Sequence, residues 1–336
     1  MDWIVDFLMT PFLGKAVWAW LVFLGLVGFL MVLDLGVLHR PDPVTGRRRE
    51  IEVGESLVLS AGYMAVGVAF GGWVWHVMGR EAGITYLTGF VVEKSLALDN
   101  IFVISLIFTA LAVPRMHQHR VLFWGILGVI VLRGLMIGFG TALVDRFHWI
   151  LWLFGAFLAI TGIKMLLTRG GDDAPDVAAN PVLCFLRRHM RVTEHLHGDH
   201  FIVRQPDAQG RLRWWATPLL LSLVVVELAD IVFAVDSVPA VLAITTDPYI
   251  VYTSNIFAIL GLRALYFALA AMMHRFVYLK VALALILVFI GGKIFWAQWV
   301  GKPDPAIGLG VTIVLIAGGI GASLWRTRKL AANGEN

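Results

Sequence analysis

Nine stretches of predominantly apolar residues follow one another along this chain, and each is long enough to cross a lipid bilayer. A transmembrane helix needs about 20 such residues. The stretches cover roughly residues 13–36, 55–78, 84–112, 120–142, 148–168, 216–244, 252–273, 278–299 and 304–325. Apolar residues make up 59% of the chain and charged residues 15%, which is far more apolar than a soluble domain. We therefore predict an all-α fold, a polytopic membrane bundle of about nine transmembrane helices.

Lys and Arg are distributed unevenly between the loops that join these stretches. If the N-terminus lies outside, every inside loop contains more Lys and Arg than every outside loop. Cytoplasmic loops carry such an excess, so we predict a multi-pass protein of the inner or plasma membrane with its C-terminus in the cytoplasm. The acidic N-terminus lacks the basic region of a signal peptide, and we expect the first stretch to be retained. The net charge of +4 follows from this topology and does not indicate a nucleic-acid partner.

Two segments of the chain carry the same pattern of polar residues. The motif E-x5-D-N that begins at Glu93 matches the motif D-x5-D-S that begins at Asp230, and Arg133 matches Arg263 further along. Each copy contains three stretches, an odd number, so the copies cross the membrane in opposite orientations. Inverted repeats of this kind are typical of secondary transporters, whose substrate site lies near the midplane between the copies.

The repeat divides the chain into five parts. Residues 1–80 form two N-terminal helices, 84–168 the first copy, 169–215 a cytoplasmic loop, 216–300 the second copy, and 303–336 the last helix and a cytoplasmic tail. The loop contains His195-Leu-His-Gly-Asp-His200, whose imidazoles and carboxylate could form a metal sensor. A solvated polar turn is the simpler interpretation, because no further ligands are spaced for a closed site. We expect a small hairpin around Pro206.

Acidic side chains inside these apolar helices must face the protein interior, because each costs about 2.5–3.5 kcal/mol at the centre of a helix. Carboxylate, amide, hydroxyl and carbonyl oxygens are ligands for Mg²⁺, Ca²⁺ or Mn²⁺. Pro239 adds a carbonyl oxygen by removing the hydrogen-bond donor of Val235. The only cysteine, Cys184, lies in the loop, so thiolate ligands within the helices are excluded. The candidate ligands of a hard divalent cation are Glu93, Asp99, Asn100, Glu227, Asp230, Asp236 and Ser237.

Basic residues inside the helices have other expected roles. Arg133 and Arg263 are expected to neutralise the acids when no cation is bound. Lys94 lies beside the first acid and is a candidate local neutraliser. Lys164 and Lys293 lie near helix ends, where their side chains can extend to the interface. Carboxylates that crowd one low-dielectric site favour the exchange of protons for metal, which is consistent with proton antiport.

The acidic segments resemble those of the TerC family, in particular its Alx-like branch of manganese exporters. The matching segments are EKSLALDNIFV from Glu93, HRVLFWGILG from His119, GIKM from Gly162 and ELADIVFAVDSVP from Glu227. The resemblance covers roughly residues 20–325 and implies an integral membrane protein that exports Mn²⁺, with a family link to tellurium-ion resistance. It implies a role for the same acids, and the choice of Mn²⁺ over Ca²⁺ or Mg²⁺ rests on it alone. We expect no enzymatic activity and no tightly bound cofactor.

The residues alone leave other functions open. An intramembrane aspartyl protease shares a proton between two buried Asp side chains, but the Gly-x-Gly-Asp pattern associated with such enzymes is absent. A non-transporting membrane partner that delivers metal to other proteins is not excluded. Export of an amino acid or another small organic solute is a further alternative, but the buried acids argue against an anionic carboxylate substrate. Asp34, near the cytoplasmic end of the first stretch, is a candidate for a vestibule.

Overall fold

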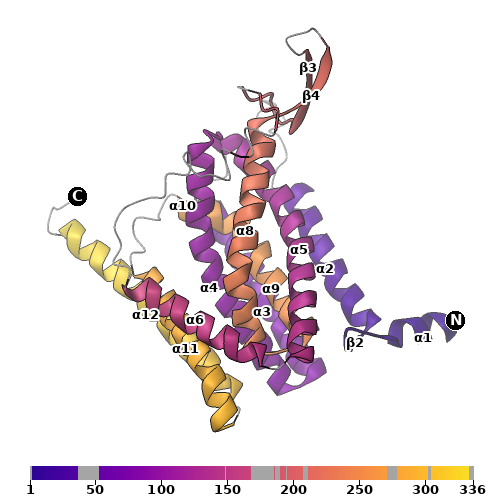
Figure 1. Cartoon of the computed structure of the whole chain (residues 1–336), viewed down its shortest axis with the longest axis vertical. Helices are drawn as coiled ribbons and strands as arrows, with labels where there is room; N and C mark the ends of the chain where they lie inside the picture. The colour runs from indigo at the N-terminus through magenta and orange to yellow at the C-terminus, as the bar shows by residue number, and fades with distance from the viewer. Residues whose placement is uncertain are drawn as a thin grey trace.

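The computed structural model describes residues 2–36, 53–147, 149–167, 185, 190–193, 195–206, 211–270, 278–301 and 304–332. Long helices dominate these ranges and pack side by side into a bundle (Figure 1). They are α2 (Val17–Gly36), α3 (Val53–Met78), α4 (Arg80–Ala110), α5 (Arg115–Arg146), α6 (Ile150–Leu167), α8 (Pro218–Leu242), α9 (Pro248–Leu260), α10 (Leu262–Ala270), α11 (Leu279–Trp299) and α12 (Pro305–Ala332). Each predicted stretch corresponds to one of these helices, except that α9 and α10 share the seventh.

Most of these helices satisfy the requirements for crossing a membrane. Among the described residues, six helical segments are long and apolar enough: α3, α5, α6, α8, α12, and α9 together with α10. Shorter apolar segments lie in α2 and α11. α4 is 31 residues long, but Glu93, Lys94 and Asp99 in its middle lower its mean hydropathy. The predicted all-α polytopic membrane bundle is confirmed.

The N-terminal part differs from the prediction. α2 begins at Val17 rather than near residue 13, because the preceding residues form a short helix, α1 (Asp2–Met9), and a hairpin of β1 (Pro11–Phe12) and β2 (Lys15–Ala16). Gly14 in the turn has a φ of 81°, which glycine adopts without strain. Lys15 pairs with Asp247 at 3.0 Å, which ties the start of α2 to the start of α9.

The expected hairpin in the loop is present and projects from one end of the bundle (Figure 1). β3 (Ile202–Pro206) pairs antiparallel with β4 (Leu212–Ala216). Asp199 Oδ1 lies 2.8 Å from His117 Nδ1 at the start of α5, which holds the polar turn at 195–200 against the bundle. In the described ranges no three His, Cys, Asp or Glu side chains are grouped to hold a metal ion. Residues 169–184, with Cys184, lie outside those ranges.

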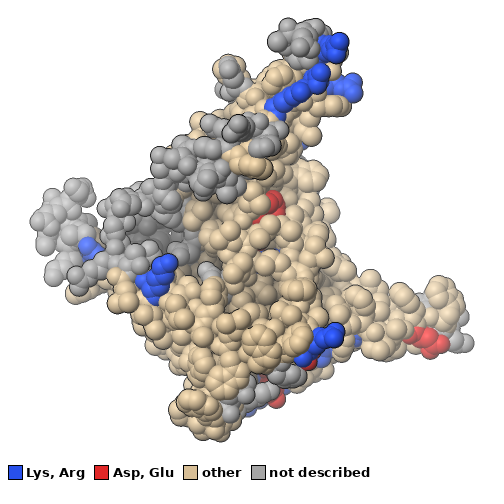
Figure 2. All heavy atoms as spheres, in the orientation of Figure 1, with Lys and Arg blue, Asp and Glu red and all other residues tan. Residues whose placement is uncertain are grey.

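The outside of the bundle is apolar. On α5, Val131, Leu135 and Phe139 recur every four residues and are 61%, 67% and 70% exposed. Such a stripe on the outer face of a long helix is suited to contact with lipid tails. Figure 2 shows a broad, mostly uncharged face between the basic side chains on the β3–β4 hairpin and the charged side chains toward the opposite end, with one acidic patch exposed within it.

The helices of the two predicted copies pack on one another reciprocally. α4 packs against α9 and α5 against α8, while α6 packs against α11 and α4 against α8. Suppose that the two copies are exchanged, so that α4 changes places with α8, α5 with α9 and α10, and α6 with α11. The α4–α9 and α5–α8 pairs then become each other, and the α6–α11 and α4–α8 pairs stay the same. Two copies related by a twofold axis are expected to give this arrangement.

The seam between α6 and α11 is tight because glycines let the two backbones touch. A Cβ on Gly162 would lie 2.6 Å from the carbonyl oxygen of Ala284, and a Cβ on Gly291 would lie 2.6 Å from that of Gly155. Small residues allow this close approach between membrane helices. The seam therefore has no room for a side chain at Gly162 or Gly291.

Candidate cation site

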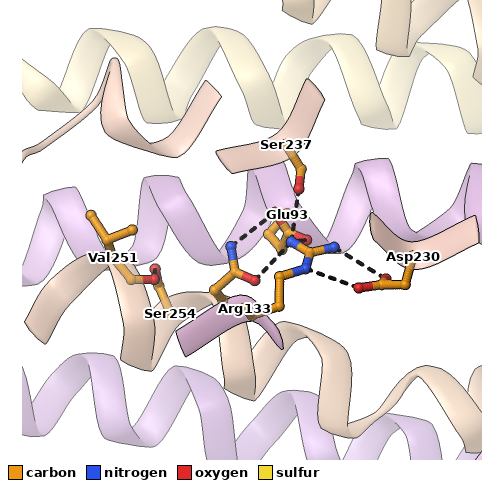
Figure 3. Close-up of polar contacts among 7 residues, drawn as sticks. Glu93, Arg133, Asp230, Ser237, Val251 and Ser254 are labelled. Carbon is orange, nitrogen blue, oxygen red and sulfur yellow. Dashed lines mark hydrogen bonds and ion pairs between the residues drawn. The ribbon is translucent and has the colours of Figure 1, made fainter. Parts of the chain in front are cut away.

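The centre of the bundle holds a buried guanidinium. Arg133 on α5 is 0% exposed, and its Nη1 donates to Glu93 Oε1 on α4 at 2.6 Å. Its Nε and Nη2 donate to the two carboxylate oxygens of Asp230 on α8, each at 3.3 Å. Figure 3 shows the guanidinium between the two acids. One cation therefore bridges acids from both predicted copies, and its matched residue, Arg263, is buried on α10.

Two uncharged side chains of the second copy complete this cluster. Nη1 of Arg133 also donates to Ser237 Oγ at 2.7 Å and to Asn255 Oδ1 at 2.9 Å. Asn255 Nδ2 in turn donates to Glu93 Oε2 at 3.1 Å. Asp230 and Ser237 are seven residues apart on α8, so they lie on one face, two turns from each other. This spacing lets a single guanidinium reach both.

The cluster carries a net charge of −1, because one guanidinium faces two carboxylates. Glu93 and Asn255 are fully buried, and Asp230 is the most exposed member at 9%. Buried ions are tolerated only when they are paired and hydrogen-bonded, and all three side-chain nitrogens of Arg133 have partners. Removing the guanidinium would leave two buried carboxylates uncompensated, whereas removing either acid would leave a one-to-one ion pair.

Glu227 lies apart from this cluster, although it is only three residues from Asp230. Both of its carboxylate oxygens are buried without a hydrogen-bond partner among the described residues. The carboxylate rests on the backbone of α5: a Cβ on Gly128 would lie 2.6 Å from Oε2, and a Cβ on Gly125 would lie 3.6 Å from Oε1. Residues three apart share a face of a helix, yet only Asp230 reaches the guanidinium.

The structure describes the other predicted ligands only in part. Asn100 is 7% exposed and lies about two helical turns beyond Glu93 on α4. α8 continues through Pro239, which leaves the carbonyl of Val235 without its helical donor. Three predicted residues lie on described helices but have side chains outside the described part: Asp34, Asp99 and Asp236. The ligand set as a whole therefore stays a prediction.

Lys94 does not neutralise Glu93, contrary to expectation. Consecutive residues on a helix point about 100° apart, and Lys94 Nζ instead donates to the carbonyl oxygen of Ala258 on α9 at 2.9 Å. Lys164 is exposed and Lys293 is half-buried. Both positions are consistent with side chains that extend toward the interface.

Asn255 is a member of the cluster that the sequence reasoning missed. It is fully buried on α9 and binds both Arg133 and Glu93. A signal was present, because Thr253, Ser254 and Asn255 are consecutive polar residues within an apolar stretch. Such residues in transmembrane helices commonly bond across to neighbouring helices.

A cavity of about 690 Å³ lies at the predicted outer ends of α4 and α8. These are the helices that carry Glu93 and Asp230. The charged residues in its lining are Arg80, Glu81, Lys293 and Asp304. Its size and polar lining meet the requirements for a site that water can enter.

The sequence matches one family model along most of its length. Residues 78–331 match the family described as "Integral membrane protein TerC family". No solved structure matches the chain.

Several bacterial proteins are similar to the chain over most of their length. A membrane protein of Myxococcus xanthus is 44% identical over 309 residues, which is 92% of each chain. One of Rickettsia felis is 42% identical over 308 residues, 92% of this chain and 98% of the relative. A protein of Salmonella typhi, provisionally named membrane-bound redox modulator Alx, is 46% identical over 272 residues, 79% of this chain and 82% of the relative. The chain therefore belongs to the TerC family of integral membrane proteins.

Proposed function

We propose that this protein exports a divalent cation across the membrane, with Mn²⁺ as the substrate. The main support is the meeting of Glu93 and Asp230, from the two predicted inverted copies, around one buried positive charge. In inverted-repeat transporters the substrate site lies where the copies meet near the midplane. The contacts of Arg133 with one acid from each predicted copy support a site of this kind.

The oxygens around this point suit a hard divalent ion. Glu93 and Asp230 supply carboxylate oxygens, Ser237 a hydroxyl and Asn255 an amide carbonyl. Mn²⁺, Mg²⁺ and Ca²⁺ prefer such ligands. The choice of Mn²⁺ follows from the resemblance to the Alx-like manganese exporters. Three other predicted ligands would extend this set: Asp99, Asn100 and Asp236.

Release of the ion would leave buried carboxylates that need other positive charge. Proton uptake from the outside would supply part of it, so proton antiport is the coupling we favour. The polar cavity at the predicted outer ends of α4 and α8 is the proposed release path. It lies on the side opposite the β3–β4 hairpin, and the hairpin is predicted to be cytoplasmic.

The second candidate is a membrane partner that contributes to metal delivery or tellurium-ion resistance without transport. The relatives named after redox modulation favour it. A single cysteine cannot form a dithiol within one chain, so a redox effect would act through a bound ion or another protein. The protease alternative is disfavoured, because Arg133 separates the acids that meet at the centre and a protease dyad shares a proton directly.

Mn²⁺ flux into proteoliposomes that contain the full chain tests the proposal. Asp99→Asn and Asp236→Asn remove the matched pair of predicted ligands, and Glu93→Gln and Asp230→Asn remove the acids at the guanidinium. Asp247→Asn is a matched control, because it removes a half-buried carboxylate outside the cluster, one that pairs with Lys15, and Asn still caps α9. Flux in the wild type and control that is lost in all four variants, with the fold intact, would support a transporter.

Two other results would change the conclusion. Unchanged flux in the four variants would reduce the acids to structural charges. Mn²⁺ binding without flux in the wild type would favour the partner function.

A further inference from the structure

The inference concerns Arg133 and rests on the proposed function. Its Nη1 carries two hydrogens, yet three oxygens lie within hydrogen-bonding distance of it: Glu93 Oε1, Ser237 Oγ and Asn255 Oδ1, at 2.6, 2.7 and 2.9 Å. Three full hydrogen bonds from two hydrogens are not available. At least one of the two hydrogens is therefore shared between acceptors, and three oxygens crowd one nitrogen of the guanidinium (Figure 3).

The two carboxylates cannot hold a divalent ion and this guanidinium in the same place. Arginine does not lose its proton in proteins, so its charge cannot be removed by deprotonation. The acids become available to another cation only if the guanidinium moves away from Asp230, from Glu93, or from both. A site that binds Mn²⁺ between these acids therefore requires a second position for the Arg133 side chain.

Glu227 offers such a position. Its carboxylate oxygens are buried and lack a partner among the described residues, and they rest on α5 beside Gly128, five residues before Arg133. Side chains on a helix lean toward its N-terminus, which for Arg133 is the direction of Gly128. Glu227 precedes Asp230 by three residues on α8, a step of about 4.5 Å along the axis.

We propose that Arg133 is a tethered counter-cation that fills the site between Glu93 and Asp230 in the empty protein and moves to Glu227 when a divalent ion binds. A divalent ion takes two positive charges with it when it leaves the site. In the empty protein the Arg133 side chain replaces one of them. The unloaded protein then changes back to the conformation that accepts a new ion without burying two uncompensated carboxylates. In the loaded state it neutralises Glu227.

Equilibrium binding of Mn²⁺ to the purified full chain in detergent tests this displacement, with free Mn²⁺ measured by electron paramagnetic resonance. Arg133→Met removes the internal competitor and is expected to tighten binding by about tenfold or more, since a binding-competent state that is rarely populated weakens apparent affinity in proportion. Glu227→Gln removes the second position and is expected to weaken binding. The double variant is expected to bind as tightly as Arg133→Met.

The double variant separates this role of Glu227 from direct ligation. If Glu227 were a ligand of the ion, the double variant would bind more weakly than Arg133→Met, and the inference would be overturned. Lys94→Met is the control for loss of a buried cation, because its ammonium contacts the Ala258 carbonyl; it is expected to leave affinity unchanged. If Arg133→Met fails to fold, Arg133→Lys replaces it. Lysine lacks the fork that grips Asp230, so binding tighter than wild type is expected and equal or weaker binding overturns the inference.

Transport by the same variants distinguishes this inference from the proposed function. Arg133→Met is expected to retain Mn²⁺–Mn²⁺ exchange, in which the protein always returns loaded, and to lose net flux by about tenfold relative to exchange. If the wild type moves Mn²⁺ and a folded Arg133→Met variant loses exchange and net flux equally, only the counter-cation role is overturned. If the wild type moves no Mn²⁺ but Arg133→Met binds Mn²⁺ more tightly, the proposed transport is overturned and the displacement of Arg133 is supported. Absence of binding in the wild type and in every variant overturns both.

Discussion

Two glycines on α5 provide a direct test of where the Glu227 carboxylate lies. A Cβ on Gly128 would lie 2.6 Å from Oε2, whereas a Cβ on Gly125 would lie 3.6 Å from Oε1. Favourable contacts between heavy atoms lie near 3.5–4.0 Å, so the first distance is about 1 Å too short and the second is ordinary. Gly128→Ala must therefore push α5 from α8 or expel the Glu227 side chain, and Gly125→Ala must do neither.

The size of each effect follows from two opposing contributions. Replacing a helical glycine by alanine stabilises the helix by about 0.5–1 kcal/mol. Overpacking a tight interface costs about 1–3 kcal/mol. Gly125→Ala is thus expected to raise the free energy of unfolding by up to about 1 kcal/mol, and Gly128→Ala to lower it by up to about 2.5 kcal/mol.

Unfolding in mixed micelles with increasing sodium dodecyl sulfate, followed by tryptophan fluorescence, measures both variants under one condition. Adding Glu227→Ala to Gly128→Ala should restore the midpoint, because the group that the new methyl meets is then absent. Equal shifts for the two glycine variants, or no restoration in the double variant, would refute the placement of Glu227 against Gly128.

Three further predictions concern the cluster, a helix cap and the topology. Asn255→Leu leaves a buried carboxylate oxygen without its amide donor, so we expect a loss of about 1–3 kcal/mol in unfolding free energy and reduced Mn²⁺ flux. Ser254→Ala removes a hydroxyl that bonds to the Val251 carbonyl within α9, and it should change neither the unfolding free energy nor the flux. Asp247→Ala removes the side chain that accepts from the first backbone amides of α9 and should lower the unfolding free energy by about 0.5–2 kcal/mol, with little change for Asp247→Asn. A single cysteine introduced at Arg204 in a cysteine-free background should react with an impermeant maleimide only from the cytoplasmic side; labelling from outside intact cells would reverse the predicted orientation.

The membrane fold could be predicted from the sequence because it depends on long-range averages. About 20 apolar residues form a transmembrane helix whatever their order, so the nine stretches located the helices even though α2 begins at Val17 and not near residue 13. The matched acidic motifs similarly predicted that Glu93 and Asp230 lie at comparable places in two copies. The neutralising role of Arg133 followed from the cost of unpaired buried charge, and its contacts confirm it.

The details of the cluster depend on which helix packs against which, and spacing along one helix does not contain that information. Lys94 follows Glu93 directly, but it points to α9 because α9 lies on that side of α4. Glu227 and Asp230 share a face of α8, yet their carboxylates have different neighbours. The carboxylate of Glu227 lies against the glycines of α5, and that of Asp230 pairs with Arg133. Asn255 was within reach of prediction, since polar residues in an apolar stretch have a partner elsewhere in the bundle.

The glycine seam between α6 and α11 bears on how a chain of this design could arise. Gly162 meets Ala284, and Gly291 meets Gly155. Residues 155 and 162 each become the residue of α11 in the other contact when 129 is added to their numbers, so these two contacts exchange into each other. Reciprocal contacts of this kind define the interface between two identical subunits. The pattern fits descent from a three-helix protein that inserted in both orientations and paired with its own inverted copy before gene duplication and fusion. Residues 168–217 would then be the joint between former subunits, and two fragments divided there and expressed together should reassemble through this seam.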